Sequence, residues 1–183
     1  MANNYDQLPR VDFEVSLSDF KRLEAIARKM EALGFEGAYA EFQREYQRAK
    51  ENSLMFIRNA AADEVDEAQK IESRQVGHSK SGYIPTGTLQ GSITPQFSKG
   101  GLKVSVVPLA TTEQAEQARQ HAKQGRQRHF QPGKAQGVHY YGVDVEFGNS
   151  KMKAEPFMKP SGEKVAVKLD GEFEEAMRRA ING

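Results

Sequence analysis

The chain is 183 residues long, about the size of one domain and enough for a single hydrophobic core. Its 26 basic and 25 acidic residues leave a net charge of +1, whereas a dedicated nucleic-acid-binding protein usually has a strong basic excess. The absence of cysteine excludes disulfides and thiolate chemistry. No apolar run approaches the ~20 residues of a membrane span, and the first residues lack a signal-peptide pattern, so we expect no membrane association.

Only 38% of the residues are hydrophobic, which is low for a compact monomer. The apolar residues nevertheless recur with clear periods, and this regularity excludes a fully disordered chain. We therefore expect either that part of the chain is extended and solvated or that neighbouring subunits complete its fold.

The chain begins with the pattern of a strand followed by a helix. Residues 11–17 alternate apolar and polar side chains, which is the period of a half-buried strand. Ser18 has the chemistry of a helix N-cap, helical spacing follows it, and Gly34 is a plausible terminator. The sequence thus predicts a strand at 11–17 and a helix that starts at Ser18.

A second and much longer helical pattern begins near Glu36 and continues to about Ser73. One straight helix of this length would span about 55 Å and would project beyond a compact domain of ordinary radius. We therefore expect either a break or bend, near Asn52 and Ser53, or a helix that reaches a neighbouring subunit, and we favour the break or bend.

The C-terminal half predicts three strands and a final helix. Strand patterns cover residues 91–97, 102–108 and 137–147, and a Lys-Gly-Gly sequence at 99–101 suits a hairpin between the first two. Residues 162–181 carry apolar side chains four residues apart, as in an amphipathic helix. These elements predict a single α+β domain over residues 1–183. Its antiparallel sheet has about four strands, two to three helices pack on one face, and open edges remain for other subunits.

A long polar insertion at residues 109–136 separates the second and third of these strands. A polar loop of this length is uncommon inside a compact domain and is usually functional or disordered. We expect a flexible segment in which residues 112–125 could form a short solvated helix. The insertion is locally basic, so it could contact a partner or the phosphates of DNA. The basic side chains concerned are Arg119, Lys123, Arg126, Arg128 and Lys134.

The prediction of function rests on two segments of the sequence. The first reads Pro-Thr-Gly-Thr-Leu-Gln-Gly-Ser-Ile over residues 85–93, a turn that enters a strand. Gly87 allows a positive φ there, and Leu89 and Ile93 supply apolar anchors. The second contains Tyr-Gly-Val-Asp-Val-Glu-Phe-Gly over residues 141–148 and continues to Pro-Phe-Met-Lys-Pro at 156–160. We expect Gly148 to end a strand and the two prolines to set the start of the last helix.

Together, and in this order, the two segments resemble the neck and tail-completion proteins of long-tailed bacteriophages. In place of the Pro-x-Asp that often precedes the first motif, Pro85 stands directly before Thr86, and Asn149 replaces the usual Thr in the second. The insertion has no counterpart in the family. The matching residues are Thr86, Gly87, Leu89, Ser92, Ile93, Tyr141, Val145, Glu146, Phe147, Gly148, Lys151, Pro156, Phe157 and Pro160.

The resemblance implies a structural virion protein that acts in head–tail joining and is not an enzyme. Its matching residues would hold the fold and the subunit contacts, and no cofactor is implied. The partners would be other neck, connector and tail proteins, further copies in a ring, and non-specifically the genomic DNA. The site of action would be the head–tail junction, after assembly in the host cytoplasm.

Other functions find less support in the residues. The four histidines, His78, His121, His129 and His139, lack the short-spaced pair of a typical zinc site. The glycines at 77–91 lack the order of a phosphate-binding loop. Asp144 and Glu146 would share one solvated face of a strand, which favours an exposed pair over an acid–base site. The alternative that stays open is a nucleic-acid-binding or regulatory module that uses the basic insertion at 119–134.

Overall fold

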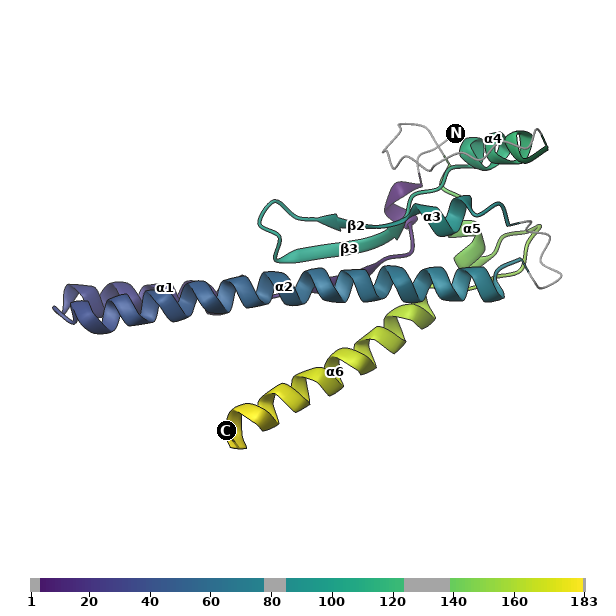
Figure 1. The fold of residues 1–183 in the computed structure, drawn as a ribbon. Coiled ribbons are helices and arrows are strands. Elements are labelled where there is room, and N and C mark those ends of the chain that lie inside the picture. Colours follow the sequence, from purple (N-terminus) through teal and green to yellow (C-terminus); the bar gives the residue numbers. More distant parts are fainter. Residues whose placement is uncertain (1–3, 78–84, 124–138, 183) are drawn as a thin grey trace.

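The structure is a computed structural model that describes residues 4–77, 85–123 and 139–182. Its dominant feature is the helix α2, Glu36–Gln75, which runs the length of the molecule (Figure 1). Helix α1, Leu17–Ala32, lies beside the first half of α2 and forms a hairpin with it. The turn between them uses Gly34 at φ 79°, as the sequence predicted. Ser16, not Ser18, precedes the first turn of α1.

Helix α2 continues through residues 52–53, so the predicted break is wrong. The Ser53 hydroxyl donates to the carbonyl of Ala49 at 2.8 Å, an ordinary bond within a continuous helix. The 40 residues of α2 span about 60 Å. The chain accommodates this length because the sheet packs on one half of α2 and α1 packs on the other.

A three-stranded antiparallel sheet covers the second half of α2. It comprises β1 (Val11–Glu14), β2 (Ile93–Phe97) and β3 (Lys103–Pro108) in the order β1-β3-β2. These strands confirm three of the predicted ones and the α+β class. The hairpin between β2 and β3 turns at Gly101, which has φ 72°.

The fourth predicted strand, at 137–147, is wrong. Gly142–Phe147 forms the helix α5, and Tyr140 makes only an isolated bridge to Thr111. The alternation of Val143, Val145 and Phe147 was a local pattern that packing overrides. In the helix, Tyr141 and Val145 share one buried face, whereas Phe147 is 63% exposed.

The remaining elements complete the end of the molecule opposite the α1–α2 turn. They are the 3-10 turn Tyr5–Gln7, α3 (Thr88–Ser92) and α4 (Thr112–Lys123). The short helix expected at 112–125 is therefore present, and a long insertion loop is not confirmed. Residues 124–138 lie outside the described part of the chain.

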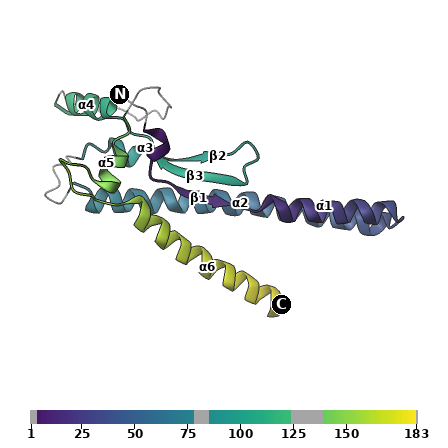
Figure 2. The same cartoon turned by 180° about the vertical axis from the view of Figure 1, so that it is seen from behind.

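The last helix, α6 (Met158–Asn182), starts against the second half of α2 and then diverges from it (Figures 1 and 2). Its first turns are tied to α2 by two ion pairs, Lys164–Glu67 at 2.8 Å and Lys168–Asp63 at 2.6 Å. Gly162 lets α6 approach β1, because a Cβ there would stand 2.9 Å from a methyl carbon of Val11. Within the described residues, no helix is long and apolar enough to cross a membrane.

The continuity of α2 can be tested with proline. Replacing Ser53 by Pro should lower the free energy of unfolding by about 3 kcal/mol, because proline removes a helical hydrogen bond and clashes with the preceding turn. The control Glu36→Pro places proline at the first helical position of α2, where it is tolerated. Chemical denaturation followed by circular dichroism measures both variants. Equal stability of the two would show that the helix breaks near residue 53.

Candidate assembly site

The structure brings the two motif segments into one core. Leu89, from the first segment, lies 3.4 Å from the position of a Cβ on Gly142, in the second. Four further motif residues share the same buried cluster, Ile93, Tyr141, Val145 and Phe157, which supports the view that the two segments form one unit. Glu146 is also buried.

The central interaction of this site is the Glu146 carboxylate at the start of α6. One of its oxygens accepts hydrogen bonds from the backbone N–H groups of Phe157 and Met158, at 2.8 and 3.0 Å. The other accepts from the N–H of Lys159 at 2.9 Å. The next residue, Pro160, has no N–H to satisfy. All the unpaired donors of the first turn are thereby accounted for, and the negative charge lies at the positive end of the helix dipole.

This geometry overturns the expectation of a solvated Asp144–Glu146 pair. Glu146 is only 4% exposed, and Asp144 instead binds the His139 ring, with 2.5 Å between Nε2 and Oδ2. The expectation failed because it placed both carboxylates on a strand, where alternate residues share a face. On the helix α5, residues two apart point in different directions.

Gly148 is required by the chain reversal that follows α5. Its φ is 75°, and a Cβ there would stand 2.7 Å from the backbone nitrogen of Ala154. It ends a helix and not the strand that the sequence predicted. The return segment is then fixed by Glu155, whose N–H donates to the Val145 carbonyl at 2.8 Å. The Glu155 carboxylate accepts from the N–H of Gly77 at 2.6 Å, which ties the loop to the end of α2.

The first motif is a tight turn that opens α3. Gly87 has φ 73° at the position before the helix, which confirms the predicted positive φ. The Thr86 hydroxyl donates to that of Thr88 at 2.8 Å. Ser92 is buried and its hydroxyl donates to the Leu89 carbonyl at 2.7 Å. Leu89 and Ile93 are buried, as expected of apolar anchors.

Not every motif residue is in the core. Phe147, Lys151 and Pro156 are exposed and lie in one stretch that begins at the last residue of α5, while Pro160 is half-buried. The motif therefore divides into buried members that build the core and exposed members that form a surface at the same end of the molecule.

Two carboxylates that the sequence analysis missed lie beneath this site, on α2. Glu64 is fully buried and accepts a hydrogen bond from the Ser161 hydroxyl of α6. Glu72 is 2% exposed, and one of its oxygens has no hydrogen-bond partner among the described residues. Their spacing in the sequence could have indicated burial. Glu64 lies four residues after Ala60 and Glu72 lies four residues after Ala68, so both lie on the apolar face of α2.

Burial raises the pKa of each of these two carboxyl groups to about 7, from an ordinary value of 4.5. For Glu64 the hydrogen bond from Ser161 opposes part of this effect, and the nearby charges of Glu67 and Glu146 reinforce it. Both groups are therefore close to half protonated at neutral pH.

Two of the five predicted basic contacts lie in the described part of the chain. Arg119 and Lys123 belong to α4, on which His121 also lies. Arg126, Arg128 and Lys134 lie outside the described residues, as do His78 and His129. Among the residues that the structure describes, no three His, Cys, Asp or Glu side chains are grouped to hold a metal ion.

Comparison with models of protein families, with curated proteins and with solved structures finds no match to this chain.

The role of Glu146 predicts a specific loss of stability. Replacing Glu146 by Ala would leave backbone N–H groups buried without an acceptor and should lower the free energy of unfolding by about 3 kcal/mol. Gln, which keeps one acceptor oxygen, should lower it by less. The exposed Glu163 on the same helix provides the control, Glu163→Ala. Urea denaturation measures all three, and an E146A protein as stable as the control would contradict the capping role.

The raised pKa of Glu64 and Glu72 predicts how stability depends on pH. The folded protein holds these protons more tightly than the unfolded chain, so their contribution is complete below about pH 4.5 and is lost as pH rises through about 7. Glu64→Gln should therefore flatten the decline in unfolding free energy between pH 5 and pH 8, whereas Glu163→Gln should not. Denaturation curves across this range measure the slopes. An E64Q slope equal to that of wild type would show that Glu64 titrates normally.

Proposed function

We propose that this chain is a structural virion protein of a long-tailed phage or prophage that acts in head–tail joining, as a neck or tail-completion subunit. Its action would be docking and not catalysis. The proposal rests on the resemblance of the two motif segments to that family. The observation that best supports it is the capping of α6 by Glu146, because this contact gives the order of the two parts of the second motif a physical reason within one fold.

The division of the motif supports a docking role. Its buried members hold α3, α5 and the start of α6 together, which gives a rigid base. Its exposed members include Phe147, an aromatic side chain that is 63% exposed. Exposed aromatic residues on a rigid base are frequent anchors of protein–protein contacts. We propose that the stretch from Phe147 to Pro156 contacts a neighbouring neck, connector or tail protein.

The open sheet edges contribute less to docking than the sequence suggested. In β2, residues 92 and 98 face β3, since Ser98 N–H donates to Lys103 and Leu109 N–H donates to Ser92. By alternation Pro95 has its backbone nitrogen on the outer edge, where it can donate no hydrogen bond. Pro95 therefore disfavours the pairing of a further strand with this edge of the sheet. We propose that the 147–156 stretch, more than β2, makes the contacts of a ring.

The function is tested in a phage whose copy of this gene is disrupted. Electron microscopy of the lysate should show full heads and free tails that fail to join. A plasmid copy of the wild-type gene should restore infectious particles, whereas Phe147→Ala should restore at least about tenfold fewer, because a docking anchor is lost. Val167→Ala, which truncates a side chain that is 73% exposed on α6 outside the motif, should restore the wild-type yield.

Two outcomes are decisive, since the first would contradict the junction role and the second only the anchor role of Phe147. Normal particles without the gene would exclude a role at the junction and would direct attention to the nucleic-acid alternative, in which duplex DNA is bound with a steep salt dependence through α4 and the residues after it. Full rescue by F147A, with equal unfolding free energies, would keep the junction role and exclude Phe147 as an anchor.

A further inference from the structure

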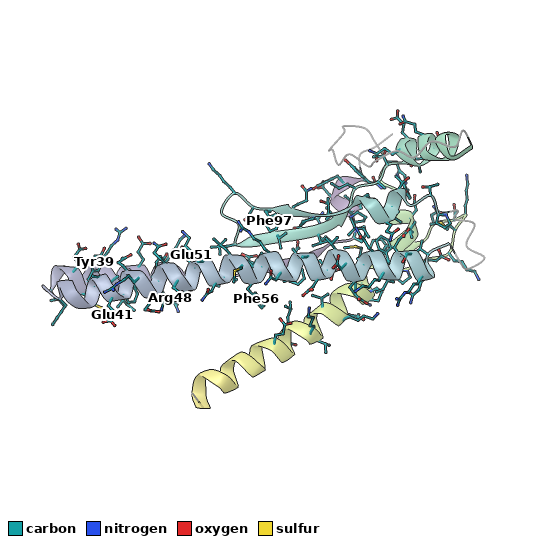
Figure 3. All side chains as sticks on the ribbon, in the orientation of Figure 1. Tyr39, Glu41, Arg48, Glu51, Phe56 and Phe97 are labelled. Carbon is teal, nitrogen blue, oxygen red and sulfur yellow. The ribbon has the colours of Figure 1, made fainter. Side chains whose placement is uncertain are left out.

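One long face of α2 is exposed along the whole arm formed with α1. The exposed positions recur every three or four residues, so they share one side of the helix. None of them is covered by α1, the sheet or α6. They are Gly37, Ala40, Arg44, Gln47, Arg48, Glu51, Met55, Arg58 and Ala62, and we call this set the α2 strip. Figure 3 shows Arg48 and Glu51 on the part of α2 that extends beyond the sheet.

Three charged side chains of the strip form no ion pair with another described residue, and they are Arg44, Glu51 and Arg58. Arg44 and Glu51 are seven residues apart, which is two helical turns, and both are exposed. Neither forms an ion pair with another described residue, and the Arg44 guanidinium makes only a long bond of 3.4 Å to the carbonyl of Ala40. Two ion pairs on the arm form within the chain instead, Arg48–Glu45 and Arg28–Glu24, both at 2.8 Å.

The strip is complementary to itself when a second copy lies antiparallel to it. With a two-fold axis centred between Gln47 and Arg48, Arg44 lies opposite Glu51 of the partner subunit. By symmetry, Glu51 lies opposite Arg44 of the partner subunit. Two ion pairs of equal geometry result, one on each side of the axis.

The sizes of the side chains fit the same arrangement. Met55, which is 60% exposed, lies opposite Ala40 of the partner subunit. Arg58 lies opposite Gly37 of the partner subunit. In both of these pairs a long side chain meets a small one, which favours close approach of the two helices. The two Arg48 side chains approach the axis, where each is already neutralised by its own Glu45.

We propose that the α2 strip is a docking surface for a second copy of this chain, which binds it antiparallel about a two-fold axis. Because a two-fold contact closes on itself, it produces a dimer and goes no further. The inference therefore goes beyond the head–tail role, whose ring requires contacts on other surfaces, and it holds or fails separately from that role.

Charge reversal tests the proposal. In sedimentation equilibrium at low salt, the full-length wild-type protein should form dimers, and 1 M NaCl should weaken them because the ion pairs are exposed. Arg44→Glu and Glu51→Arg each oppose like charges at both sites and should raise the dimer Kd by at least about tenfold. The double variant restores opposite charges in swapped positions and should return the Kd to within about threefold of wild type.

The control is Arg28→Glu, which makes the same charge change on α1 of the same arm, outside the strip. It should leave the Kd unchanged, and circular dichroism checks that every variant keeps its helices. The proposal is overturned if the wild-type protein stays monomeric up to about 1 mM. It is also overturned if the double variant dimerises no better than the single ones, or if R28E weakens the dimer equally.

Discussion

The carboxylate of Glu146 is the interaction on which the C-terminal half of the structure depends. It comes from a six-residue helix, α5, and it satisfies the three N–H donors that open the 25-residue helix α6. A buried charge is tolerated there because several hydrogen bonds and the helix dipole act on it together. The same contact fixes where α6 leaves the core, so it sets the direction of the longest surface element after α2.

The direction of α6 also depends on what it crosses. Ser161, in its first turn, donates to the buried Glu64 of α2, and the outer pairs Lys164–Glu67 and Lys168–Asp63 follow along the same side. The Glu64 carboxyl group loses its proton near neutral pH. The two outer ion pairs are exposed, and each contributes little to the free energy of unfolding. The contact between Ser161 and Glu64 therefore stabilises the packing of α6 on α2 less above about pH 7 than below it.

The two proposed contact surfaces lie on different parts of the molecule. The stretch from Phe147 to Pro156 lies near the C-terminal end of α2, to which the Glu155–Gly77 hydrogen bond ties it. The α2 strip begins near the opposite end of the same helix and extends to Ala62. The continuous helix α2 connects the two surfaces. The arm formed by α1 and α2 accounts for the low hydrophobic content of the chain, because a two-helix hairpin buries less apolar surface than a compact domain does.

The sequence by itself determined the elements whose signals are local. These are three strands, α1, the extent of the α2 pattern, the amphipathic α6 and the positive φ of Gly34 and Gly87, all of which follow from periodicity and from glycine's freedom. The tertiary structure alone decided that residues 142–147 form a helix, that α2 does not break, and that Glu146 and Glu64 are buried. Each of these depends on atoms far away in the sequence. The N–H groups of α6, the sheet beneath α2 and the hydroxyl of Ser161 are such partners, and no local pattern contains them.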